Sequence, residues 1–145
     1  MIPLGIRVRI RIELRGKTIN TVALANSGFE TDSPQLLVPR RLLIASNTDP
    51  KTLGRHNEVE HDTAGGSVVM HVYPYACKVK VIEDDRVSQD VVSDLVISPI
   101  EREVVMSDAL IEALGLVLLS PRRGLWRFID DPPDIVRNSY NPEYW

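Results

Sequence analysis

With 43% hydrophobic, 26% charged and 6% aromatic residues, the 145-residue chain has the composition of one globular domain and not of a disordered chain. Its formal net charge of −3 argues against a general nucleic-acid binder, and no apolar run approaches the roughly 18 residues of a membrane span, so we expect neither nucleic acid nor membrane as a partner. The single cysteine, Cys77, excludes a disulfide within the chain and a cysteine-based zinc site, and it favours a reducing, cytoplasmic location.

The N-terminal third predicts a β-hairpin, a sharp turn, a short strand and a short helix. Residues 6–15 alternate strictly between apolar and polar, mostly charged, side chains, which is typical of a strand with one face in solvent. Asn26-Ser27-Gly28 follows the second strand, and these residue types favour turns because they satisfy backbone groups locally. The expected elements are strands over 6–15, 18–25 and 36–38, a helix over 40–45 with Pro39 in its first turn, and a loop over 46–55.

The remainder predicts further short strands around one more helix. Ala64-Gly65-Gly66 separates two alternating runs and predicts a hairpin with a flexible tip. Ser107 or Asp108 is suited to cap the later helix. The expected elements are strands over 58–63, 67–73 (closed by Pro74) and 77–81, one within 87–97, one over 104–106, a helix over 109–114, and a hairpin of 117–119 with 125–129.

These elements predict a mainly β fold, a sandwich or barrel of short, mostly antiparallel strands with two brief helices. We expect a single domain over residues 1–129. Residues 130–145 form a proline- and acid-rich tail with an aromatic end, either frayed or docked on the body or on a second subunit.

The run Thr21-Val22-Ala23-Leu24-Ala25-Asn26-Ser27-Gly28 resembles the strand and turn of retroviral-type (retropepsin-like) aspartic proteases, where apolar residues lead into Asp-Thr/Ser-Gly. The later order of Leu36-Leu37-Val38-Pro39, a glycine-tipped hairpin and Val104-Val105-Met106 before a helix is also similar to that family. Two positions depart from it, since Asn26 replaces the aspartate and Ser107 stands where glycine is common. The resemblance spans residues 6–129 in element order and implies a retropepsin-like acid-protease β-barrel.

The resemblance also implies a symmetric homodimer in which each subunit contributes one aspartate to a pair that shares a proton. It places Asn26, Ser27 and Gly28 at the catalytic motif and Ala64, Gly65 and Gly66 at the tip of a flap that covers substrate. It implies no cofactor, and a peptide or protein as the ligand of the cleft.

A carboxamide at position 26 carries no titratable proton and is no base, so two Asn26 side chains could hold a water but not activate it. Three interpretations remain open. The chain is a natural non-catalytic relative that keeps the cleft; or it is an active aspartic endopeptidase whose aspartate was substituted by engineering or whose role passed to another acid; or the match is chance, and the chain is an unrelated β-rich interaction module.

Other candidate residues have simpler structural explanations. Glu30, Asp32 and Asp108 could supply an acid, but the first two have the setting of solvated turn residues and the third that of a helix cap. His56, His61 and His71 match no compact ligand spacing, and even if His61 faced His71 across the hairpin they would give two ligands, so we expect no metal. The alternation of Cys77 with Val79 and Val81 predicts that Cys77 is a core residue. The face of Arg7, Arg9, Arg11 and Arg15 is either a phosphate or acidic-partner site or a solvated face with salt bridges.

Overall fold

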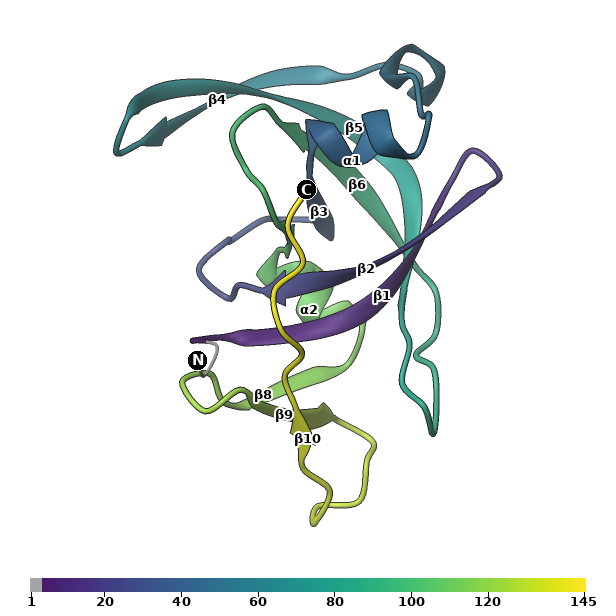
Figure 1. The fold of residues 1–145 in the computed structure, drawn as a ribbon, viewed down its shortest axis with the longest axis vertical. Coiled ribbons are helices and arrows are strands. Elements are labelled where there is room, and N and C mark those ends of the chain that lie inside the picture. The colour runs from purple at the N-terminus through teal and green to yellow at the C-terminus, as the bar shows by residue number, and fades with distance from the viewer. Residues whose placement is uncertain (1–3) are drawn as a thin grey trace.

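A computed structural model describes residues 4–145, apart from the side chain of Thr63; residues 1–3 of the expected domain lie outside it. Figure 1 shows the arrangement of its strands and helices. In chain order the elements are β1 (Ile6–Leu14), β2 (Lys17–Ala25), β3 (Gln35–Pro39), α1 (Arg40–Ala45), the 3-10 helix η1 (Pro50–Leu53), β4 (Asn57–Thr63), β5 (Gly66–Val81), β6 (Val91–Ser98), β7 (Val104–Met106), α2 (Asp108–Ala113), β8 (Leu116–Ser120), β9 (Leu125–Phe128) and β10 (Arg137–Asn138).

Six strands of the described chain close into a barrel, as the expected mainly β class allows. They follow the order β1-β2-β7-β3-β6-β5, and β5 pairs back onto β1 from Ile10↔Val81 to Glu13↔Lys78. The pairing of β5 with β1 closes the strands into a ring, and the apolar residues of β1 point into the core. Two of the pairings, β2 with β7 and β3 with β6, are parallel. Alternation alone does not reveal strand direction.

Strand β5 continues through Pro74, which corrects the expectation that this proline ends a strand. Its pairing with β6 shifts register between Tyr73 and Cys77, and Tyr75 adopts a left-handed conformation with φ of 54°. Proline is tolerated at such a bulge because its missing N–H is not needed there. The bulge separates a first half that pairs with β4 from a second half that pairs with β1.

The helices begin at slightly different residues from those expected, and one short helix was not expected. Pro39 is the extended residue before α1 rather than part of its first turn. The expected loop over 46–55 contains η1, whose start is capped by the Asp49 side chain. Ser107 caps α2 by accepting a hydrogen bond from the N–H of Leu110, so Asp108 is the first helical residue. The helices within residues 4–145 have six residues at most, far too few for a bilayer crossing.

The C-terminal tail is docked along the outside of β1 and β2 (Figure 1, yellow). The N–H of Tyr140 donates to the carbonyl of Arg7 at 2.9 Å, and the indole N–H of Trp145 donates to Thr21 Oγ1 at 3.1 Å. Arg7, on the face expected to be solvated, is only 8% exposed and pairs with Glu103 at 2.5 Å between Nε and Oε1. The tail and this ion pair therefore cover the N-terminal end of that face.

A small second sheet of β8, β9 and β10 is anchored by a network around Asp131. The Asp131 carboxylate accepts from Arg137 Nε at 2.9 Å, from the N–H of Phe128 at 2.8 Å and from Arg86 at 3.3 Å. These contacts, led by the hydrogen bonds from Arg137, lower the pKa of Asp131 to about 2. The Arg137 guanidinium also donates two hydrogen bonds to the carboxylate of Asp85.

We expect Asp131→Asn to lower the free energy of unfolding by about 2 kcal/mol at pH 7, because hydrogen bonds to charged groups are lost. The folded pKa lies below the ordinary aspartate value, so this contribution is complete above about pH 5 and disappears as pH falls toward 2. Urea unfolding at several pH values checks both points. The exposed tail residue Asp134 supplies the control, Asp134→Asn, which should change little. A gap between wild type and Asp131→Asn that does not narrow in acid contradicts this assignment.

Candidate functional site

The Asn26-Ser27-Gly28 segment forms a tight, exposed turn at the end of β2. The N–H of Asn26 donates to the carbonyl of Met106 at 3.2 Å, which continues the pairing of β2 with β7. The Asn26 side-chain oxygen accepts from the N–H of Gly28 at 3.0 Å, and a Cβ at position 28 would come within 3.2 Å of that oxygen. The side chain thus closes its own turn, with glycine at the crowded point.

Strand β7 pairs with the end of β2 and leads directly into α2, so the Asn26 turn lies beside the start of that helix. Met106 pairs with Ala25 of β2 on one side and with Leu36 of β3 on the other, so the turn and α2 meet at one end of the three strands. Ser107, directly after β7, accepts at Oγ from the N–H groups of both Gln35 and Leu110. One hydroxyl therefore joins β3 to the first turn of α2.

Asp108 fastens the loop after the turn to the same helix. Its Oδ1 accepts from the N–H of Thr31 at 2.9 Å and from the N–H of Ala109 at 2.7 Å. Its own N–H donates to the carbonyl of Phe29 at 2.8 Å. The carboxylate is thus used for backbone hydrogen bonds, and Asp108 is a positioning residue for the loop.

A hollow of ≈ 600 Å³ lies between this loop and the β4–β5 hairpin. Figure 1 shows the hairpin projecting beyond the barrel on the side where the loop between β2 and β3 also projects. Residues 28–33 and Gln35 line one wall, and Val59, His61 and Val72 of the hairpin line the other. An apolar cluster of Leu37, Met70, Val96 and Val105, with Leu24, Phe29 and Val72 packed on it, lies next to this space.

Of the predicted motif and flap residues, Gly28 alone is among the described residues that line this hollow. Gly28 lies in its lining, and Asn26 and Ser27 form the exposed turn just before it. Ala64, Gly65 and Gly66 lie at the exposed tip of the hairpin, beyond the valines and histidine that form the wall. The carboxylates of Glu30 and Asp32 are on exposed residues at the loop wall.

Asp94 is a positioning residue that the sequence analysis missed. It is 7% exposed on β6, and its carboxylate accepts from Ser33 Oγ at 2.8 Å and from the N–H of Tyr75 at 2.9 Å. Its N–H donates to the carbonyl of Pro34. Asp94 therefore joins the loop wall to the bulge of β5, and its one sequence signal is an acid within the apolar run of β6.

Cys77 is a core residue, as its alternation predicts. It is 3% exposed, and burial, with a smaller contribution from Asp94, raises the pKa of its thiol to about 12. A thiol held neutral in this way is a poor nucleophile.

His61 and His71 do not face each other across the β4–β5 hairpin. The register of the hairpin places His61 opposite Val68 and His71 opposite Glu58. His61 lies on the wall of the hollow and shares its face of the hairpin with its cross-strand partner Val68. His71 is three residues from Val68 along β5, so its side chain lies on the other face.

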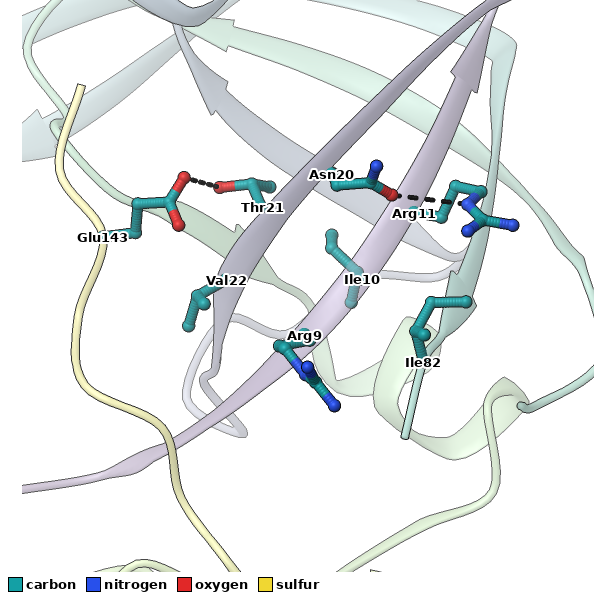
Figure 2. Close-up of a pocket in the computed structure, with 8 residues that line it drawn as sticks. All are labelled: Arg9, Ile10, Arg11, Asn20, Thr21, Val22, Ile82 and Glu143. Carbon is teal, nitrogen blue, oxygen red and sulfur yellow. Dashed lines mark hydrogen bonds between the residues drawn. The ribbon is translucent and has the colours of Figure 1, made fainter. Parts of the chain in front are cut away.

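The remaining arginines of β1 lie beside a separate hollow of ≈ 260 Å³ between β1, β2 and the tail (Figure 2). Arg9 donates to Asp84 at 2.9 Å and lies over the Tyr140 ring, 4.8 Å from its centroid. Arg11 donates to the side chain of Asn20 at 3.3 Å. Arg15 is in the β1–β2 turn, with φ of 48°. The ion pairs of Arg7 and Arg9 favour the salt-bridged interpretation at these two positions over a phosphate site.

A scan against protein-family models and a search of curated proteins both find no match for this chain.

We expect Asp108→Ala to loosen the loop wall, since the N–H of Thr31 loses its acceptor, and to lower the free energy of unfolding by about 1–2 kcal/mol. Hydrogen exchange should become faster at the Thr31 amide. Glu112→Ala, an exposed acid on the same helix, is the matched control and should leave that amide unchanged. Equal protection of Thr31 in both variants contradicts the positioning role.

Proposed function

We propose that this chain is a retropepsin-like domain that binds an extended peptide segment in a cleft between the 26–34 loop and the β4–β5 hairpin, as a homodimer and without aspartic peptidase activity. The observation that carries the proposal is the exposed turn at Asn26, closed by a carboxamide, next to a hollow walled by a projecting hairpin.

The order of the elements supports the relation to aspartic proteases. A closed barrel has β7 inserted between β2 and β3, and the turn after β2 lies beside the helix that follows β7. The sequence resemblance assigns the catalytic motif to this same turn. Two copies related by a two-fold axis at Asn26 would bring the two turns together and complete the cleft between them.

The missing acid separates binding from catalysis. Peptide hydrolysis of this type needs one carboxyl group to act as a base toward water while the other donates a proton. The Asn26 carboxamide can do neither, and its oxygen is already bonded to the N–H of Gly28. The Asp108 carboxylate already accepts hydrogen bonds from two backbone N–H groups, so it is poorly placed to take over the role of a catalytic aspartate.

The walls of the hollow favour a peptide with an apolar side chain flanked by basic ones. Phe29, Val59 and Val72 offer apolar contact, while Glu30 and Asp32 add negative charge at the exposed loop. Strand β4 is the end strand of its sheet, so an extended peptide could also pair with the backbone of β4. A cytoplasmic location, expected from the single cysteine, stays a prediction.

A cleavage assay on an unfolded protein over ~pH 3 to 6 tests the catalytic part of the proposal. We expect no cleavage by the wild type and measurable cleavage by Asn26→Asp, because the substitution restores one carboxyl group per subunit. Asn26→Ala is the control that changes the turn without adding an acid. Cleavage by the wild type would instead favour an active endopeptidase that uses another acid, whereas no cleavage by any variant would favour an unrelated interaction module.

Peptide binding is tested with two matched valine variants. Val59 is 39% exposed and lines the hollow, whereas Val92 is 48% exposed on β6 and is not part of that wall. We expect Val59→Glu to weaken binding of a labelled peptide with leucine or phenylalanine between lysines by about tenfold, as measured by fluorescence anisotropy. Val92→Glu should leave binding unchanged. Equal effects of the two variants, or no binding by the wild type, contradict a peptide cleft at this place.

A further inference from the structure

We propose that His56, Glu58 and His71 form a Zn²⁺ site at the base of the β4–β5 hairpin, on the face opposite the hollow. The spacing of the histidines in the sequence favours no metal, because His56 and His71 are separated by the whole hairpin. The fold brings them together, and each residue offers one ligand atom within 4.8 Å of the other two.

The strand register fixes the central pair of this site. Glu58 of β4 and His71 of β5 are direct cross-strand partners, so their side chains leave the hairpin on the same face. His71 Nδ1 lies 3.9 Å from Glu58 Oε1, which is too far for a hydrogen bond. His56, just before β4, places its ring 5.0 Å from the His71 ring between centroids.

The His71 imidazole has an unsatisfied nitrogen aimed into this cluster. Its Nδ1 is buried and has no hydrogen-bond partner among the described residues. A buried nitrogen without a partner costs free energy, and a metal ion coordinated there would remove that cost. The buried Tyr73 lies behind the site, with its ring 4.9 Å from that of His56.

The donor set points to zinc. Two imidazoles and one carboxylate form a set that Zn²⁺ binds, with a fourth position left to water, whereas Mg²⁺ and Ca²⁺ prefer oxygen alone. Ligand atoms on a tetrahedral zinc lie about 3.4 Å apart, since each is about 2.0–2.1 Å from the metal. Rotations of the exposed His56 and Glu58 side chains can close the remaining gap.

Bound zinc would join the segment before β4 to the first half of β5. It would therefore hold the base of the hairpin without occupying the hollow, which lies against the other face. This inference does not depend on the proposed function, because it concerns metal binding by one chain and needs neither a peptide nor a second copy.

The test titrates ZnCl2 into the full chain, prepared without a histidine tag, and follows the heat of binding. We expect one Zn²⁺ per chain with a Kd in the micromolar range or tighter, and a visible ligand-field absorption when Co²⁺ replaces Zn²⁺. His71→Ala and Glu58→Gln should each raise the Kd at least about tenfold. His56→Ala alters an exposed residue and gives the same readout if His71→Ala fails to fold.

His61→Ala is the matched control, because His61 is on the same hairpin but on the opposite face. It should leave the Kd unchanged. Hydrogen exchange in β4 and the first half of β5 should slow when Zn²⁺ is added to the wild type and to His61→Ala. A Kd no tighter than millimolar overturns the proposal. Equal weakening by His61→Ala and His56→Ala also overturns it, since it indicates adventitious binding to surface histidines.

Discussion

The bulge in β5 between Tyr73 and Cys77 is the constraint on which the rest of the structure depends. Before the bulge, β5 forms the projecting hairpin with β4; after it, the same strand closes the barrel on β1. The buried carboxylate of Asp94 accepts a hydrogen bond from the N–H of Tyr75 in the bulge and another from the hydroxyl of Ser33 in the loop wall. Barrel closure, the direction of the hairpin and the position of the loop are therefore coupled through one side chain.

Local patterns in the sequence predict the elements but not how they are joined. The alternation of residues 6–15 indicates β1, because a strand with one buried face requires it. Pro74 predicts a strand end that does not occur. Proline lacks a backbone N–H and therefore usually ends a strand, but it is tolerated at a bulge such as this one. The burial of Arg7 could not be predicted, because it depends on Glu103 and on the docked tail, both distant in sequence.

The candidate site shows the same division. Residue types alone predict a turn at Asn26-Ser27-Gly28, but its place beside α2 depends on β7 entering between β2 and β3. The cluster of His56, Glu58 and His71 depends on hairpin register, and a shift of one residue would move each side chain to the other face. The hairpin thus has two chemically different faces. One forms the largely apolar wall beside the loop, and the other bears the side chains of Glu58 and His71, which are of types that bind metal ions.

The proposed dimer brings two copies together at the Asn26 turn, and intermolecular disulfide formation by Asn26→Cys tests it most directly. The native Cys77 is buried and its pKa is raised, so it does not compete for mild oxidants. A disulfide needs Cα atoms within about 7 Å, which residues at a shared two-fold axis satisfy. We expect a covalent dimer for Asn26→Cys and none for Glu13→Cys, an exposed position on β1. An Asn26→Cys chain that stays monomeric under oxidation, with a wild type that sediments as a monomer, would contradict it.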